Sequence, residues 1–255
     1  MKKFNMCEEC NREYTDPTNR RFHAQPNACK TCGPHIWIED STGTKIEVED
    51  VIDWTRQKLK EGKIFAIKGL GGFNLVCDAT NEEAVNLLRI RKNRPHKPFA
   101  VMLRNIEDVK KYCDVAVEEE KLLTGCIKPI VILDQGNGYD LPKCIAPHQK
   151  TLGVMLPYTP LHHLLFGNGI EALIMTSANG HELPLEYKNE SAVDKLRNVV
   201  DYFLQHNRNI HAPIDDSVVK VVDNEIHMIR RARGYVPEPI KKDNIKEILA
   251  CGSNM

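Results

Sequence analysis

The sequence predicts an α/β protein with a small cysteine-rich module at its N-terminal end. From residue 64 onward, short apolar runs of the kind found in buried strands alternate with helical patterns. Several of these runs lead directly into polar or glycine-rich turns. Residues 1–34, in contrast, are polar, lack strand or helix periodicity, and contain two Cys-x-x-Cys pairs, so we expect a metal to hold them together.

Composition fits a globular protein of 255 residues, with 42% hydrophobic and 27% charged residues. That length allows one ordinary domain and a small additional module. Lys plus Arg and Asp plus Glu number 35 each, which argues against a large non-specific surface for polyanions. No apolar run is long enough to span a bilayer and the first residues lack a signal-type apolar segment, so we expect no membrane contact and a cytoplasmic location.

The cysteine spacing predicts one structural zinc site. Two short pairs separated by eighteen residues can close a tetrahedron around Zn2+ without an open position. The expected ligands are Cys7, Cys10, Cys29 and Cys32. The alternatives are four unrelated buried cysteines or a redox dithiol, but a dithiol is expected in a βαβ context that neither pair has. His23 and His35 are interpreted as loop histidines.

The first half of the expected domain begins with a hairpin over 36–48 and a helix over 50–60 that stops at Gly62. A buried strand over 64–67 runs into the glycine turn 68–72. A helix over 81–91 follows, with Thr80 as N-cap and Glu83 completing a capping box. Further strands are expected over 99–103 and 129–133, with helices over 107–112 and 117–123 between them.

The second half continues the alternation. A strand over 153–157 ends at a proline, and Pro160 opens a helix through residue 166. A strand over 172–175 leads into the polar turn 176–179. A helix over 191–200, an extended segment over 202–204, and a hairpin of 217–222 with 225–230 around Asp223 and Asn224 complete the pattern.

Local cation clusters predict an anion site. Five cations, among them Lys92, Arg94 and Lys97, occur between residues 89 and 97. They could simply cap a helix C-terminus. However, Lys68 opens a glycine turn after a strand, and a second strand exits into Thr176–Asn179; ligands of open α/β sheets bind at such strand ends. The glycine turn lacks the P-loop order, and Ser, Asn and Gly could be ordinary turn residues. A further cluster, Arg230, Arg231 and Arg233, could equally be a solvated face.

Several motifs resemble those of the HypF family. Residues 7–34, with both cysteine pairs, look like the second zinc finger of this carbamoyltransferase of [NiFe]-hydrogenase maturation. Residues 63–240 resemble its YrdC-like domain. The motifs are AIKGLGGF (66–73), RKNRPHKPFAVM (91–102), GVMLP (153–157), MTSAN (175–179), HNR (206–208), DDSVV (215–219) and RRARGYVP (230–237).

The resemblance implies a YrdC/Sua5-like twisted mixed sheet with flanking helices. It divides the chain into a finger module (1–36), a connecting hairpin and helix (37–62), a YrdC-like nucleotide-binding domain (63–240), and a linker (241–255) toward a Kae1-like domain that is absent. An acylphosphatase domain and a first finger would precede the sequence. We therefore expect part of a longer protein.

The implied chemistry is carbamoyl adenylation. ATP, with Mg2+, and carbamate from carbamoyl phosphate would give carbamoyl-AMP, whose carbamoyl group passes to the C-terminal cysteine of a HypE-like partner. The resemblance places the catalytic site on Lys92, Arg94, Ser177 and Asn179. Its motifs and the charge clusters add these candidates for ATP binding: Lys68, Arg91, Lys97, Thr176, His206, Asn207, Arg208, Ser217 and Arg231.

Two other functions fit the sequence less well. A threonylcarbamoyl-AMP synthase of tRNA modification would share the domain, but the finger and the RRARGYVP run argue against it. Double-stranded RNA binding would require many phosphate contacts, which the balanced charge and sparse aromatics do not favour.

Overall fold

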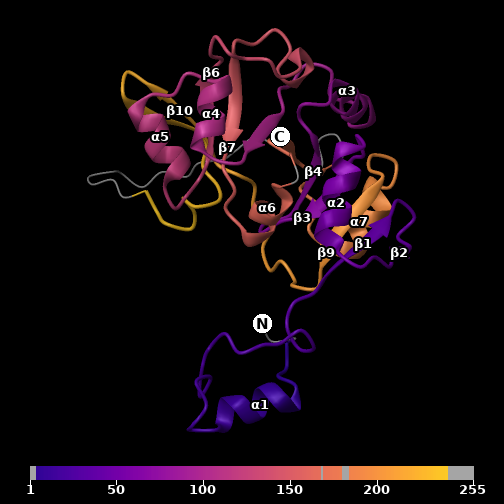
Figure 1. Ribbon diagram of the computed structural model, residues 1–255. Helices are drawn as coiled ribbons and strands as arrows, with labels where there is room; N and C mark the ends of the chain where they lie inside the picture. The colour runs from indigo at the N-terminus through magenta and orange to yellow at the C-terminus, as the bar shows by residue number, and fades with distance from the viewer. Residues whose placement is uncertain (1–3, 168, 180–183, 241–255) are drawn as a thin grey trace, which may run out of the picture.

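The computed structural model describes residues 4–167, 169–179 and 184–240. Its main body is one mixed sheet in the order β11-β10-β6-β7-β5-β8-β4-β3-β9-β1-β2 (Figure 1). The strands are β1 (Ile36–Asp40), β2 (Lys45–Ile46), β3 (Phe65–Lys68), β4 (Phe73–Asp78), β5 (Ala100–Leu103), β6 (Ile130–Asp134), β7 (Thr151–Met155), β8 (Ala172–Ser177), β9 (Tyr202–His206), β10 (Val218–Val222) and β11 (Glu225–Arg230). Pairs β3–β9, β5–β7 and β6–β10 are parallel, and the remaining pairs are antiparallel.

The central strands are buried on both faces, which explains why they read as unbroken apolar runs. In β3, Ala66 packs into one core while Phe65 and Ile67 pack into the other. Strand β5 divides its residues in the same way, with Met102 on the face opposite Val101. The sheet therefore separates two apolar layers.

Helices cover both faces. They are α2 (Val51–Lys60), α3 (Glu82–Arg91), α4 (Ile106–Tyr112), α5 (Val117–Thr124), α6 (Pro160–Leu165) and α7 (Asn189–Leu196), with a 3-10 turn η1 at Lys143–Ile145. Leu88 of α3, Val109 of α4 and Leu196 of α7 enter the larger core. Leu59 of α2 and Leu165 of α6 enter the smaller one, and these two helices touch each other. The predicted α/β class, a twisted mixed sheet with flanking helices, is confirmed.

Four local predictions need correction. Strand β4 was not expected, because Asn74 interrupts its apolar pattern, yet it pairs with both β3 and β8. The N-cap of α3 is Asn81 rather than Thr80: the Asn81 side chain accepts the backbone N–H of Ala84, whereas Thr80 bonds Asp78. Helix α7 begins and ends earlier than the expected 191–200. Residues 1–34 lack helical periodicity in the sequence, but they include the helix α1 (Glu8–Thr15).

The expected hairpin over 36–48 joins the main sheet, since β1 pairs with β9 along five residues, from Ile36 opposite His206 to Asp40 opposite Tyr202. The cysteine module with α1 lies to one side of this sheet, as Figure 1 shows. Among the described residues, no helix is both long and apolar enough to cross a membrane. The linker predicted for 241–255 lies outside the described residues.

Candidate nucleotide pocket and cysteine cluster

The loop after α3 and the end of β8 meet through Lys92 and Arg94. Lys92 Nζ donates to the carbonyl of Ser177 at 2.7 Å and to Asn179 Oδ1 at 3.0 Å. Arg94 Nη1 donates to Thr176 Oγ1 at 3.0 Å. Residues 85 positions apart in the sequence are thus in direct contact. The convergence that we expected of these two segments is present in the structure.

Arg89 holds this loop in place. Its guanidinium is buried and donates to the carbonyl oxygens of Lys97, at 3.2 Å, and of Arg94. It also reaches the carbonyl of Ile145 at 3.0 Å and lies over the Phe99 ring, 4.5 Å from the centroid. The loop that carries Lys92 and Arg94 is therefore fixed from inside the protein, and the simple helix-capping interpretation does not apply to Arg89.

Beside Arg94 lies a cavity of about 250 Å³ over the strands β5, β6, β7, β8 and β10. Part of its floor carries small side chains only, because Ala100 pairs with Gly153 across β5 and β7. A Cβ added at Gly153 would lie 3.2 Å from Ile130 Cγ2. The polar residues at its edge are Arg94, Lys97, Thr151, Thr176, Ser177, Asp215, Asp216 and Arg230. The apolar lining beside concentrated cations suits part of a nucleotide, since the volume lies just below the roughly 300 Å³ at which protein ligand sites begin.

Burial first, and mutual repulsion second, make the charges of Lys92 and Arg94 costly without a bound anion. Burial, and then repulsion from Arg94 and Lys97, lowers the pKa of Lys92 to about 8. Burial also lowers the pKa of Arg94 to about 10. The pKa of Lys97 is lowered mainly by Arg94. A polyanion in the cavity would relieve this repulsion.

Four predicted ATP-binding residues lie elsewhere. Lys68 Nζ donates to Asn189 Oδ1 at 2.5 Å and to the carbonyl of His206 at 3.1 Å, toward α7 and β9. Asn207 Oδ1 accepts the backbone N–H of His35, beside the cysteine module. Arg208 is exposed. Lys68, His206, Asn207 and Arg208 do not line the cavity described above.

The glycine turn after β3 packs against neighbouring loops. A Cβ at Gly71 would lie 2.2 Å from the carbonyl oxygen of Ile214, and a Cβ at Gly72 would lie 2.4 Å from Leu185. The backbone N–H of Ile214 donates to the Gly71 carbonyl. These glycines therefore allow close approach of the segment that leads to Asp215, and their turn does not line the cavity.

Arg91, Ser217 and Arg231 also point away from the cavity. Arg91 forms an ion pair with Asp201 at 3.0 Å. Ser217 is fully buried, and its hydroxyl bonds the backbone of Ala232 and Arg233. Arg231 donates to the carbonyl oxygens of Tyr235 and Glu238. Within the described residues these side chains fix the chain segments around the pocket.

Four polar residues line the cavity that the sequence analysis did not choose as site residues: Thr151, Asp215, Asp216 and Arg230. Arg230 Nη1 lies 3.9 Å from Asp215 Oδ2, and Asp216 is held by Arg233 at 2.6 Å. The signal for three of these residues was present in the motifs, since DDSVV contains Asp215 and Asp216 and RRARGYVP begins at Arg230.

The four cysteines of the N-terminal module form a compact cluster. Their sulfur atoms all lie within 4.8 Å of one another, with Cys7–Cys29 at 3.6 Å, Cys10–Cys32 at 3.7 Å and Cys29–Cys32 at 3.9 Å. A tetrahedron with Zn–S bonds of about 2.3 Å has edges of about 3.8 Å, so the arrangement fits zinc. Backbone N–H groups of Cys32 and Thr31 lower the pKa of the Cys29 thiol to about 6, which favours the ligating thiolate.

Two family models match the chain. The model described as Telomere recombination, which groups Sua5, YciO and YrdC proteins, matches residues 57–232. The model described as HypF finger matches residues 6–39. The chain belongs to the Sua5/YciO/YrdC family, and a HypF finger precedes that domain.

Within that family, the chain is similar to HypF over its whole length. It is 45% identical to carbamoyltransferase HypF of Rhodobacter capsulatus, across 100% of the chain and 34% of that protein. It is 41% identical to the probable carbamoyltransferase HypF of Methanocaldococcus jannaschii, across 98% of the chain and 39% of that protein. The chain thus spans little more than a third of these relatives' length.

Two solved structures have a fold similar to that of this chain. Full-length HypF in a phosphate- and nucleotide-bound form superposes with a TM-score of 0.85 and 50% identity, covering 94% of this chain and 31% of that one. A Pyrococcus abyssi Sua5 structure shares the fold alone, with a TM-score of 0.62 at 17% identity over 72% of this chain and 55% of that one. The YrdC/Sua5-like fold predicted from the motifs is confirmed.

Proposed function

We propose that this chain catalyses carbamoyl adenylation, the ATP-dependent step of a HypF carbamoyltransferase. The observation that carries the proposal is the meeting of Lys92 and Arg94 with the end of β8, where Arg94, Thr176 and Ser177 line the cavity. Lys92 and Asn179 lie behind Ser177 and do not line the cavity themselves. The similarity to HypF carbamoyltransferases along the whole chain supports the same reaction. One of the similar structures is described as nucleotide-bound.

The reaction joins two anions. A carbamate oxygen attacks the α-phosphorus of ATP, the new O–P bond forms, and the bond from that phosphorus to the bridging oxygen breaks, releasing pyrophosphate. No side-chain nucleophile is needed. The protein must hold the reactants in line and neutralise the charge that develops at phosphorus. Lys92 and Arg94 supply that charge in a fixed position, because their contacts with the end of β8 hold them in place.

The remaining groups have supporting roles in the proposal. Ala100 and Gly153 form a floor for the planar base, while Lys97 and Arg230 extend the positive charge at the edge. The carboxylate of Asp215 is a suitable oxygen ligand for the Mg2+ that accompanies ATP. The four cysteines hold a structural zinc ion that folds the finger, since they leave no open coordination position.

We further propose that carbamoyl phosphate is the source of carbamate and that the product passes to a HypE-like acceptor. Both proposals concern the complete carbamoyltransferases, of which this chain corresponds to about a third. Adenylation is the step that its own residues support.

The test is ATP–pyrophosphate exchange in the presence of carbamoyl phosphate or carbamate. Lys92→Ala and Arg94→Ala each lower exchange by about 100-fold or more, the usual effect of removing a preorganised charge contact. The zinc content stays the same. Lys110→Ala on α4, where the lysine pairs with Glu120, is the matched control and retains exchange. Full exchange in either pocket variant would refute the proposed site.

Threonylcarbamoyl adenylation is the second candidate, because the chain is 31% identical to the threonylcarbamoyl-AMP synthase of Photorhabdus laumondii over 48% of its length and 66% of that protein. Pyrophosphate release with ATP, threonine and bicarbonate separates the two activities. The HypF finger at residues 6–39 favours the carbamoyl reaction.

A further inference from the structure

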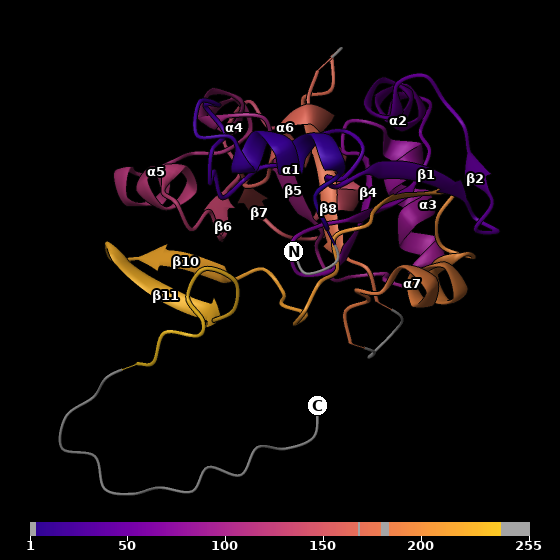
Figure 2. The ribbon, with the colours of Figure 1, turned by 90° about the horizontal axis from the view of Figure 1, so that it is seen from below.

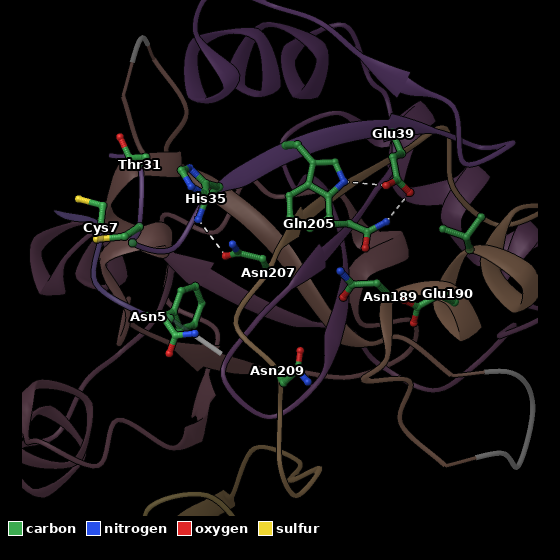
Figure 3. A pocket seen from close by; sticks show the side chains of 15 residues that line it. Asn5, Cys7, Thr31, His35, Glu39, Asn189, Glu190, Gln205, Asn207 and Asn209 are labelled. Atoms are coloured by element: carbon green, nitrogen blue, oxygen red, sulfur yellow. Dashed lines mark hydrogen bonds between the residues drawn. The ribbon is translucent and has the colours of Figure 1, made fainter. Parts of the chain in front are cut away.

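A second cavity lies between the cysteine module and the edge of the sheet, apart from the nucleotide pocket. Its volume is about 740 Å³, within the range of protein ligand sites. The finger contributes Asn5, Thr31 and His35, and the sheet and α7 contribute Glu39, Asn189 and Gln205 (Figure 3). It shares no lining residue with the nucleotide pocket.

Gln205 presents an unused hydrogen-bond acceptor at this cavity. The residue is only 1% exposed, and its Nε2 donates to Glu39 Oε2 at 2.6 Å. This contact fixes the amide orientation, because a carboxylate accepts hydrogen bonds and cannot donate one. Gln205 Oε1 has no hydrogen-bond partner among the described residues. A buried polar atom of this kind is costly until a ligand or water satisfies it.

Glu39 is held rigidly beside it. Trp37 Nε1 donates to Glu39 Oε1 at 2.6 Å, so each carboxylate oxygen already accepts one bond and keeps a further acceptor direction (Figure 3). Glu190 of α7 adds a second carboxylate to the lining. This part of the cavity therefore offers hydrogen-bond acceptors and negative charge.

No lysine or arginine side chain lines the cavity in the described part of the chain. The nearby ammonium of Lys68 is buried, and it bonds Asn189 Oδ1 and the carbonyl of His206. The cavity thus selects for a cation rich in donors.

We propose that this cavity binds an arginine side chain of a polypeptide segment. A guanidinium has five N–H donors and can pair with the Glu39 carboxylate, bond Gln205 Oε1, and stack on the Trp37 indole. The amide side chains of Asn5, Asn207 and Asn209 at the cavity can pair with the main chain of such a segment. The volume exceeds that of one side chain, which favours a peptide over a free amine.

Trp37 also provides a probe. Trp54, the other tryptophan of the chain, is replaced by Phe, so that emission reports on Trp37 alone. The probe ligand is an acetylated and amidated Gly-Arg-Gly tripeptide, compared with the corresponding Gly-Glu-Gly peptide and with free arginine. We expect a saturable emission change with the arginine peptide only, and no competition by ATP.

Three variants locate the site. Glu39→Gln weakens binding of the arginine peptide about tenfold, because a charge-assisted hydrogen bond is lost. Glu190→Gln, at an exposed position, weakens it about threefold. Glu49→Gln, an exposed residue outside this cavity, leaves the affinity unchanged. If Glu39→Gln changes the Trp37 emission without any peptide, the peptide affinity of the Glu190→Gln variant tests the proposal instead.

Three results would overturn the proposal. One is the absence of a saturable response to the arginine peptide, which would mean that water alone satisfies Gln205. Another is equal affinity for the glutamate peptide or for free arginine, which excludes recognition of a basic polypeptide. The third is unchanged affinity in both Glu39→Gln and Glu190→Gln.

Discussion

At the scale of single residues, the direction in which a side chain points decides its role. Arg91 and Lys92 are adjacent, yet Lys92 contacts the end of β8 while Arg91 pairs with Asp201 on the other side of α3. Arg230, the last residue of β11, lines the cavity, whereas Arg231 after it bonds the carbonyl oxygens of Tyr235 and Glu238. A motif therefore identifies a cluster of cations, but only the backbone path assigns each cation to the pocket or to the scaffold.

The lowered pKa of Lys92 predicts that nucleotide affinity depends on pH. Its pKa is lowered to about 8, so the ammonium is present below that pH and is lost above it. Nucleotide affinity should fall as pH rises through about 8, by up to tenfold per pH unit before it levels off. Calorimetric titration of ATP on either side of this pH measures the effect.

The matched control is Lys92→Met, which has no titrating ammonium. It binds ATP weakly and loses the alkaline fall in affinity. A fall of the same size in Lys92→Met would assign the titration to another group.

At the scale of elements, β5 and β7 form the pocket floor because small residues face each other. Ala100 lies opposite Gly153 in the parallel register, and β6 runs along the other side of β7. The glycine turn after β3 serves the same pocket indirectly, since Gly71 admits the Ile214 segment that leads to Asp215.

The floor yields a prediction for Gly153→Val. Valine suits a strand, but its side chain would fill the space over the floor and press on Ile130. We expect a loss of ATP affinity of about tenfold or more with a retained fold, as a few contacts and part of the cavity are lost. Calorimetry measures the affinity and circular dichroism the fold, with Gly136→Val, remote from the pocket lining, as the matched glycine control.

At the scale of the whole molecule, the finger and the sheet depend on different sources of stability. Among the described residues before β1, Cys10 is the only buried hydrophobic side chain. The sheet has two extensive cores of its own. The view in Figure 2 also places the β10–β11 hairpin at the opposite edge of the molecule from β1 and β2.

Metal removal should therefore act on the finger alone. A chelator unfolds residues 6–34 because zinc supplies about 10 kcal/mol or more to such modules. The sheet and ATP binding persist, whereas the Trp37 signal of the finger cavity changes. Backbone NMR of the stripped and zinc-loaded protein distinguishes these regions. Loss of the sheet resonances together with those of the finger would contradict this independence.

The sequence by itself determined the features that depend on local spacing: the cysteine pairs, the alternation of strands and helices, and the motifs that identify the family. It could not determine β4, since Asn74 breaks a local pattern that pairing with β3 and β8 restores. Tertiary structure alone decided that Lys92 and Arg94 reach β8 while Lys68 and Ser217 turn into the scaffold. The physical reason is that side-chain contacts across 80 or more residues depend on sheet order and register, which no local pattern encodes.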